Sequence, residues 1–178
     1  MQRGGVGARA LNTELQKALN GSTEYITKYG QNYAIGDKVM QVENDYDKEI
    51  YNGDIGYIRK IDLNEQIAEI EFDGEIKEYD FTDFDKITLA YATTIHKSQG
   101  SEYPVVVIPL FMQSYLMLQK NLIYTGITRG KRLVILVVEK KALVIGSTSK
   151  KSILRYTKLK DQVQGLWVRR QLKTPYIN

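Results

Sequence analysis

The sequence predicts an α/β fold with a small antiparallel β-barrel inserted into it, and three patterns support this prediction. The first is the helical spacing of apolar residues over 7–20. The second is a series of short alternating runs across 36–87, separated by turn dipeptides. The third is a pair of continuous apolar runs, 105–109 and 133–138, with a helical pattern between them. Such runs fit strands that are buried on both faces of a parallel sheet. A strand, a helix and a strand in this order indicate a parallel βαβ unit.

Residues 7–20 predict one amphipathic helix. Its apolar residues at helical spacing are Leu11, Leu15, Ala18 and Leu19. Gly21 suits the end of this helix, because glycine readily takes the left-handed conformation found there. Residues 21–35 show no clear period and are interpreted as a connecting loop.

The alternating runs of 36–87 predict a strongly curved β-barrel of SH3-like size. Asp73-Gly74 suits a tight two-residue hairpin turn, whose backbone angles favour glycine. Residues 43–85 are acidic, so this barrel is not a basic DNA-binding surface by charge alone.

A helix is predicted over 114–128 and a short one over 139–145. The domains expected are therefore a discontinuous α/β domain, the inserted barrel and a basic C-terminal tail, with the boundaries 1–35 and 88–145, 36–87, and 146–178. For the tail, one further helix and a disordered segment both remain open.

Composition excludes several classes of site. The chain has no cysteine and one histidine, His96, which excludes disulfides, thiolate sites and multi-histidine zinc sites. No apolar run has the roughly 18 residues of a membrane helix, and the N-terminus is not a signal peptide, so we expect a cytoplasmic protein without membrane contact. Lys120–Lys173 holds fourteen Lys or Arg against two acidic residues, which suits nucleic acid or simply a solvated basic surface.

Residues 91–102 form a dense polar loop after an apolar stretch. Its short donors are Thr93, Thr94, His96, Lys97, Ser98 and Gln99. Many such groups in one loop are costly to bury without partners, and they suit phosphate and sugar oxygens. The plainer alternative is a capped turn with a hydrogen-bonded histidine.

Residues 122–132 place Arg129 at the end of a predicted helix, pointing outward. A bidentate, always charged guanidinium suits a developing phosphoryl charge. The alternative is an arginine that only interacts with the helix dipole or with water. Glycines and arginines at 2–12 give a weak phosphate-site signal, and the chain contains no G-x-x-x-x-G-K-[ST] motif.

Three of these segments resemble helicase motifs. YATTIHKSQGSEYPVVVIPL resembles motif V, NLIYTGITRGKRLVILV resembles motif VI, and RGGVGARALNTELQKALN resembles the region of motif IV. The barrel between them is similar to the SH3-like domain inserted at this point. Over residues 1–145 the chain resembles the second RecA-like domain of superfamily 1 RecD/TraA-type DNA helicases (exodeoxyribonuclease V alpha-subunit-like). The resemblance implies a RecA-like parallel-sheet domain without its own P-loop.

The resemblance also implies roles at the nucleotide. Arg129 corresponds to the arginine finger that reaches the γ-phosphate of ATP. Arg3 matches a second phosphate-sensing arginine. Gly100 and Glu102 match positions near the nucleotide ribose.

Other positions are expected to meet single-stranded DNA or to couple it to the ATP cleft. These are Thr93, Thr94, His96 and Lys97, and for His96 a hydrogen bond that only orders the loop remains an alternative. Tyr124 and Thr128 are expected to be structural. Barrel contacts with DNA are expected from aromatic residues or a few bases, namely Tyr57, Phe72, Lys38 and Arg59.

By this resemblance the intact protein is an ATP-dependent 5′–3′ DNA helicase or translocase. ATP and Mg²⁺ are expected to bind mainly to the N-terminal RecA-like domain, outside this chain, so this chain alone should be inactive. Its other expected partners are single-stranded DNA and repair or recombination subunits. Two rivals remain open: a non-enzymatic DNA-binding module, and a degenerate motor that senses nucleotide.

Overall fold

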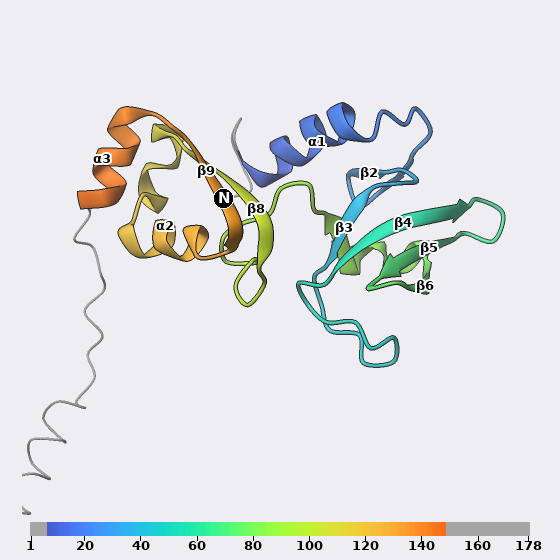
Figure 1. Ribbon diagram of the computed structural model, residues 1–178. Helices are drawn as coiled ribbons and strands as arrows, with labels where there is room; N and C mark the ends of the chain where they lie inside the picture. The colour runs from blue at the N-terminus through green and yellow to red at the C-terminus, as the bar shows by residue number, and fades with distance from the viewer. Residues whose placement is uncertain (1–6, 149–178) are drawn as a thin grey trace, which may run out of the picture.

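The computed structural model describes residues 7–148, and Figure 1 shows their elements in two neighbouring groups. The chain starts with helix α1 (Ala8–Leu19) and strands β1 (Ile26–Lys28) and β2 (Gln31–Tyr33). The barrel group contains β3 (Lys38–Gln41), β4 (Ile55–Asp62), β5 (Ile67–Phe72), β6 (Glu75–Asp80), the 3-10 helix η1 (Phe81–Lys86) and β7 (Ile87–Leu89). The last group contains β8 (Tyr103–Leu110), the 3-10 helix η2 (Met112–Met117), α2 (Lys120–Ile127), β9 (Gly130–Val138) and α3 (Lys140–Thr148). The predicted tail lies outside the described residues from 149 onward.

Helix α1 confirms the predicted N-terminal helix, and Gly21 follows it with a positive φ of 63°. The face that it buries is not the predicted apolar one. Leu19 is 68% exposed, whereas Asn12 is buried. The reason is that α1 packs against carbonyl groups and a carboxylate near the barrel, which amide side chains satisfy and leucines do not.

The prediction of a loop over 21–35 is wrong, because β1 and β2 form an antiparallel hairpin there. Lys28 pairs with Gln31 across a two-residue turn. The turn residues Tyr29 and Gly30 both have positive φ, 47° and 72°, as tight hairpin turns of this length require. Strands of three residues are too short to show a recognisable alternation.

Five antiparallel strands form the sheet of the barrel group, in the order β6-β5-β4-β3-β7. The predicted turn at Asp73-Gly74 is confirmed: both residues have positive φ, and Phe72 pairs with Glu75 across them. A single buried cluster fills the interior and includes Tyr33, Val39, Ile50, Ile58, Ile70, Tyr79, Phe81 and Phe84. Strand β7 pairs with β3 and buries Ile87 and Leu89 in the same cluster, so the sheet continues two residues past the expected limit of the barrel.

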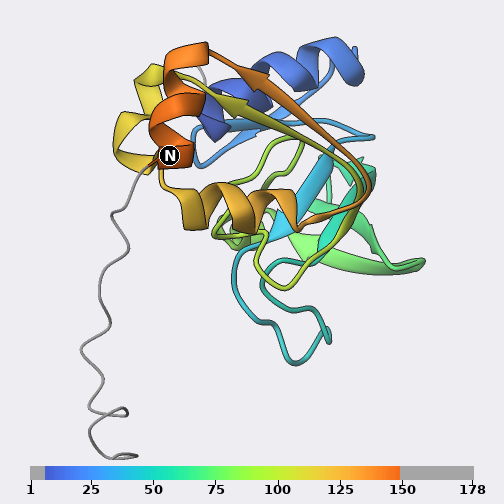
Figure 2. The ribbon, with the colours of Figure 1, turned by 60° about the vertical axis from the view of Figure 1, so that its left-hand side comes forward.

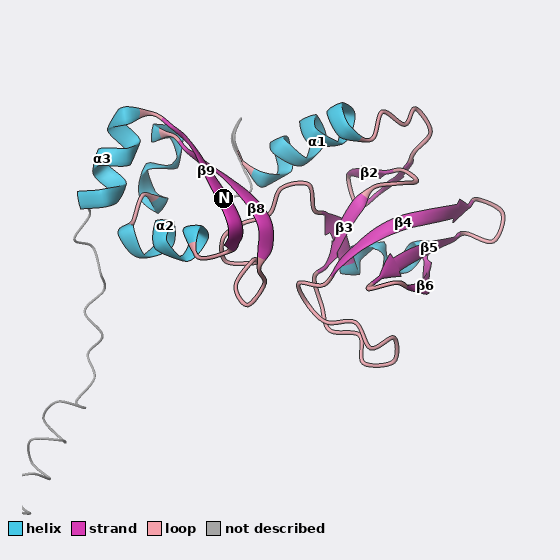
Figure 3. Cartoon of the chain, viewed as in Figure 1, coloured by secondary structure: helices cyan, strands magenta, loops and turns pink. Residues whose placement is uncertain are grey.

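Strands β8 and β9 pair in parallel, with Val106 opposite Val134, as the two apolar runs predict. Helices α2 and α3 lie with η2 on one face of this pair (Figures 2 and 3). The opposite face is exposed at Val105, Val107 and Ile135, by 51%, 57% and 43%. The expectation that these strands are buried on both faces is therefore wrong for residues 7–148, because helices cover one face only.

The helix expected over 114–128 is interrupted. Its first part belongs to η2, and α2 begins only at Lys120. Gln119 between them has extended backbone angles, and the preceding Leu118 is buried against Ala142 of α3. Packing of Leu118 thus accompanies the break.

No helix within residues 7–148 has the length and apolar character needed to cross a membrane. The same residues contain no group of three or more His, Asp or Glu side chains placed to hold a metal ion.

Candidate functional site

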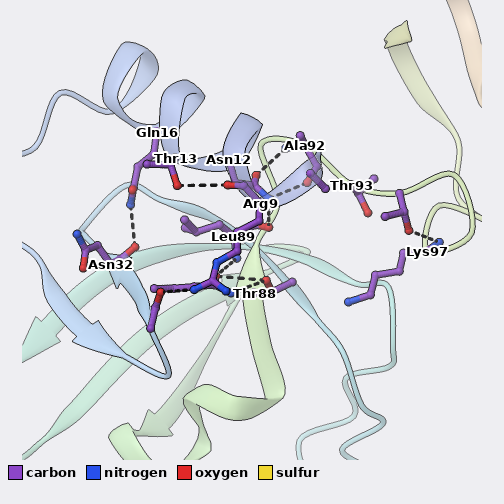
Figure 4. Close-up of a pocket in the computed structure, with 14 residues that line it drawn as sticks. Arg9, Asn12, Thr13, Gln16, Asn32, Thr88, Leu89, Ala92, Thr93 and Lys97 are labelled. Atoms are coloured by element: carbon purple, nitrogen blue, oxygen red, sulfur yellow. Dashed lines mark hydrogen bonds between the residues drawn. The ribbon is translucent and has the colours of Figure 1, made fainter. Parts of the chain in front are cut away.

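A polar cleft of about 420 Å³ lies where α1, the β1–β2 hairpin, β7 and the loop after β7 meet (Figure 4). Its side chains are mostly amides, hydroxyls and two cations: Arg9, Asn12, Thr13, Gln16, Gln31, Asn32, Thr88, Thr93, Thr94 and Lys97. Three of the four residues predicted to contact DNA, namely Thr93, Thr94 and Lys97, line it. Such a lining suits phosphate and sugar oxygens better than an apolar ligand.

Asn12 fixes the start of the polar loop. Its buried side-chain nitrogen donates to the carbonyl oxygens of Leu89 and Ala92, at 3.0 and 2.9 Å. Its side-chain oxygen accepts from the backbone nitrogen of Ala92 at 2.7 Å. Because all three bonds are made from one side chain, the loop leaves β7 at a defined place beside α1.

Two further amides continue this face of α1 at four-residue spacing. Gln16 and Asn20 both donate to the carboxylate of Asp37, Asn20 at 2.6 Å. Asp37 is fully buried and also accepts from the hydroxyl of Tyr91 at 2.9 Å and the backbone nitrogen of Ala34 at 2.8 Å. Burial and this bond to Asp37 raise the pKa of Tyr91 to about 12. Helix α1, the barrel and the root of the polar loop are thus joined by one hydrogen-bonded network.

The β1–β2 hairpin forms the other wall of the cleft. Arg9 donates to the carbonyl oxygen of Gly30 at 2.8 Å, and Gln16 donates to that of Asn32 at 3.0 Å. These bonds hold the hairpin against α1. The guanidinium of Arg9 therefore lies at the cleft edge, on the side opposite Lys97 (Figure 4).

The polar loop is folded into consecutive turns. The hydroxyl of Thr94 accepts from the backbone nitrogen of Lys97 at 3.3 Å, and the buried Ser98 donates to the carbonyl of Ile95 at 2.9 Å. Thr93 is exposed at the cleft. His96 is also exposed but is not among the cleft-lining residues. Within the described part of the chain, its side chain makes no hydrogen bond that would order the loop.

Arg129 follows α2 and does not point outward as predicted. Its guanidinium donates to the carbonyl oxygens of Thr125 and Ser101, at 3.2 and 3.0 Å, and to the hydroxyl of Thr128 at 3.3 Å. Thr125 lies in the last turn of α2, where free carbonyls attract a cation. The observed geometry is that of the plainer alternative, in which the arginine satisfies the end of a helix.

The predicted nucleotide residues cluster around the same point. Gly100 has a φ of 89°, which lets the chain turn sharply before Ser101, the residue that accepts from Arg129. Glu102 forms a 3.0 Å ion pair with Lys131, and both side chains are more than half exposed. Gly100, Glu102 and Arg129 are thus brought together, whereas Arg3 lies outside the described residues.

The four barrel residues expected to contact DNA differ in their exposure. The prediction of a DNA contact at Phe72 is wrong, because its side chain is 6% exposed and lies in the barrel core. Burial lowers the pKa of Lys38. Tyr57 is 41% exposed, but the guanidinium of Arg59 lies 5.5 Å from its ring and is paired with Glu71 at 2.6 Å. The side chains of Tyr57 and Arg59 on β4 therefore already contact each other or Glu71.

Sequence reasoning missed Arg9, Asn12, Gln16 and Asn32 as cleft residues. A signal existed for the first three, since polar side chains at 9, 12 and 16 share one face of the predicted helix. No comparable signal marked Asn32, which depends on a hairpin that was read as a loop.

Two family models match adjacent parts of this chain. Residues 11–72 match the SH3 domain of ATP-dependent RecD-like DNA helicases, and residues 89–137 match the UvrD-like helicase C-terminal domain. The chain belongs to the RecD-like helicase family. This confirms the family expected from the three motif-like segments and the barrel between them.

Relatives of this RecD-like chain include the ATP-dependent RecD2 DNA helicase of Deinococcus radiodurans, 34% identical over 74% of the chain and 18% of the relative. The RecBCD enzyme subunit RecD of Haemophilus influenzae is 31% identical over 74% of the chain and 19% of the relative. The chain thus spans about a fifth of the length of these relatives.

Solved structures similar to the RecD-like chain include Pif1 helicase from Bacteroides in complex with ADP-AlF3 and ssDNA. The TM-score is 0.54 at 16% identity, over 90% of this chain and 44% of that one. Pif1 helicase from Candida albicans matches with a TM-score of 0.53 at 16% identity, over 89% and 47%. These likenesses establish the predicted RecA-like fold, and the family model over residues 11–72 establishes the predicted SH3-like domain.

Proposed function

We propose that this chain is the second motor domain of an ATP-dependent helicase or translocase that moves 5′ to 3′ along single-stranded DNA. Its boundaries would be 1–35 and 88–145, with the barrel of 36–87 inserted and the basic tail of 146–178 following. The observation that carries the proposal is that one polar loop, 91–102, reaches both proposed sites. One end of this loop lines the cleft with Thr93, Thr94 and Lys97, and the other contacts Arg129 through Ser101.

In this function the cleft holds the sugar-phosphate backbone. Lys97 and Arg9 supply positive charge, and the threonine hydroxyls and nearby amides supply neutral hydrogen bonds. A grip of this kind reads no sequence, as a translocase requires. His96, exposed beside the cleft, would meet the strand from outside it.

Arg129 is proposed to stabilise the charge that develops during phosphoryl transfer in a neighbouring motor domain. ATP would supply the phosphoryl group and Mg²⁺ would offset its charge, both held mainly by the preceding RecA-like domain. To act, the guanidinium must exchange the carbonyls of Thr125 and Ser101 for phosphate oxygens. Gly100 and Glu102 would lie near the nucleotide, and Arg3 is proposed as a second phosphate contact. The chain by itself would not hydrolyse ATP.

The test is DNA-stimulated ATPase activity in a form of the protein that includes the nucleotide-binding domain. We expect Arg129→Ala to lower turnover at least a hundredfold, as for other arginine fingers, while single-stranded DNA binding persists. Arg132→Ala, at an exposed arginine three residues further on, is the matched control. Unchanged turnover in Arg129→Ala would contradict the proposed role.

A second candidate function, a DNA-binding module without a catalytic role, is favoured by one observation. The Arg129 guanidinium donates to Thr125, Thr128 and Ser101, as a structural arginine at the end of a helix does. In that case Arg129→Ala would lower the melting temperature of the chain and leave the ATPase activity unaffected, whereas Lys97→Ala would still weaken DNA binding. RecD-type repair or recombination subunits remain proposed partners in either case.

A further inference from the structure

The loop between β3 and β4 extends away from the barrel sheet in Figure 1, and its sequence contains two tyrosines. Tyr46 is 74% exposed and Tyr51 is 50% exposed. Their rings meet edge to face, with centroids 6.2 Å apart and planes at 77°. Aromatic rings are more often packed than presented to water, so a pair held this way is a candidate contact surface.

The loop that carries them is tied down by its own hydrogen bonds. Asp45 and Ile50 exchange two backbone bonds of 2.7 and 2.9 Å, and Ile50 is buried in the barrel core. The backbone nitrogen of Tyr51 donates to the carboxylate of Asp54 at 2.7 Å. A ligand that stacks on these rings would therefore have little chain entropy to overcome.

The base of this loop lies beside the proposed DNA grip. The carbonyl oxygen of Lys97 is 3.9 Å from the place that a Cβ atom would occupy on Gly53. The hydroxyl of Thr93 lies 3.9 Å from the sulfur of Met40, which belongs to the neighbouring strand β3. A strand that leaves the cleft past Lys97 would thus next meet the β3–β4 loop.

Charge decides which part of a nucleotide can face the tyrosines. The loop carries Glu43, Asp47 and Glu49 within three residues of Tyr46 or Tyr51 in the sequence, and its one lysine, Lys48, is paired with Asp83 at 3.2 Å. This surface repels phosphates. It leaves uncharged aromatic surfaces available, and any base can stack on these without sequence preference.

We propose that Tyr46 and Tyr51 form a base-stacking site for single-stranded DNA, adjoining the backbone grip at Thr93–Lys97. The inference rests on the proposed function, because it takes the strand to lie in the cleft. It assigns the two parts of a nucleotide to two surfaces. The cleft binds phosphates, and the acidic loop, which repels phosphates, stacks on bases.

The experiment uses the whole 178-residue chain and measures its affinity for a labelled oligo-dT by fluorescence anisotropy. A second oligonucleotide has the same backbone but abasic sites. For the wild type we expect abasic sites to weaken binding about tenfold, and for Tyr46→Leu/Tyr51→Leu about tenfold weaker binding to oligo-dT. The double variant should no longer distinguish the two oligonucleotides. Tyr25→Leu, at a tyrosine 58% exposed outside this loop, is the matched control.

Both substituted side chains are exposed, so the variants should fold, and an unchanged melting temperature would confirm it. If the double variant binds both oligonucleotides as the wild type does while Lys97→Ala weakens binding, the stacking site is refuted and the grip stands. An equal loss on both oligonucleotides also refutes stacking, since bases would not matter. If the wild-type chain binds neither, the stacking site and the DNA grip both fail, while the role of Arg129 in ATPase activity remains separately testable.

Discussion

The barrel and the β8–β9 unit differ in how completely each one buries its own apolar residues. The barrel closes five strands and η1 around one core that includes Phe84 and Ile58 at 0% exposure. The β8–β9 unit has two strands, helices on one face, and a smaller cluster with four buried members. A sheet covered on one face leaves apolar residues in water, whereas parallel sheets are ordinarily covered on both. The stability of residues 7–148 should therefore come mainly from the barrel and its junction with α1.

The largest expected effect is in the barrel core. Phe84→Ala should lower the free energy of unfolding by about 4 kcal/mol, because it opens a cavity among Tyr33 and Phe81, which contact its ring. Urea denaturation of the chain measures this. Ile76→Ala, at a residue 52% exposed on the same sheet, should cost less than about 1 kcal/mol. Similar losses for both variants would show that the barrel is not the main source of stability.

Next is the junction between α1 and the polar loop. Asn12→Ala should cost about 2 kcal/mol, because it leaves the backbone groups of Leu89 and Ala92 without partners. It should also weaken single-stranded DNA binding several-fold, since the root of the loop loses its fixed place. Lys17→Ala, on the exposed side of α1, is the control. Lower stability with full DNA affinity would mean that the junction does not position the grip.

Alkaline pH is expected to destabilise the barrel and its junction with α1, because three tyrosines with raised pKa values lie there. Burial, then Asp37, raises the pKa of Tyr91 to about 12, and burial also raises the pKa values of Tyr33 and Tyr79. A raised pKa in the folded state gives stability that is complete below pH 10 and is lost as pH rises toward 12. The urea midpoint should fall over this range, and Tyr91→Phe should make the fall shallower. An equally steep fall in the variant would exclude Tyr91 as a contributor.

The smallest effect is expected on the bare face of β8. Val107→Thr should change the free energy of unfolding by less than about 0.5 kcal/mol, because Val107 is 57% exposed. Ile108→Ala, its neighbour on the helix-covered face, should cost about 3 kcal/mol. Sedimentation velocity should show weak self-association of the wild type that decreases in Val107→Thr. A large destabilisation by Val107→Thr would mean that another part of the chain covers this face.

Long and regular sequence patterns gave correct predictions, and short ones did not. The apolar runs of β8 and β9 and the Asp73-Gly74 turn were predicted correctly because each has a strong local signal. The β1–β2 hairpin was missed because its strands are three residues long. The family, too, followed from segments a dozen or more residues long, and the matches to both family models confirm it.

Side-chain positions depended on partners that are distant in sequence. Asn12 is buried because its acceptors lie 77 and 80 residues away, and no helical pattern contains that information. One of the three partners of Arg129, Ser101, is likewise 28 residues away, whereas Thr125 and Thr128 are local and match the alternative of an arginine at a helix end. Local sequence patterns therefore do not predict polar residues that are buried by contacts with distant segments of the chain.

The polar loop connects the proposed DNA grip to the proposed phosphate contact of Arg129 through a short segment. Only three residues separate Lys97, at the cleft, from Ser101, which holds the guanidinium of Arg129. Four fully extended steps span at most about 14 Å, and a folded turn spans less. Ser98 N donates to Thr94 O and Ser101 N donates to Ser98 O, so a displacement at one end reaches the other as long as these turns stay folded. If Arg129 leaves Ser101 for a phosphate, we expect the threonines and lysine in the cleft to move with it, and the proposed grip on DNA to change in the same step.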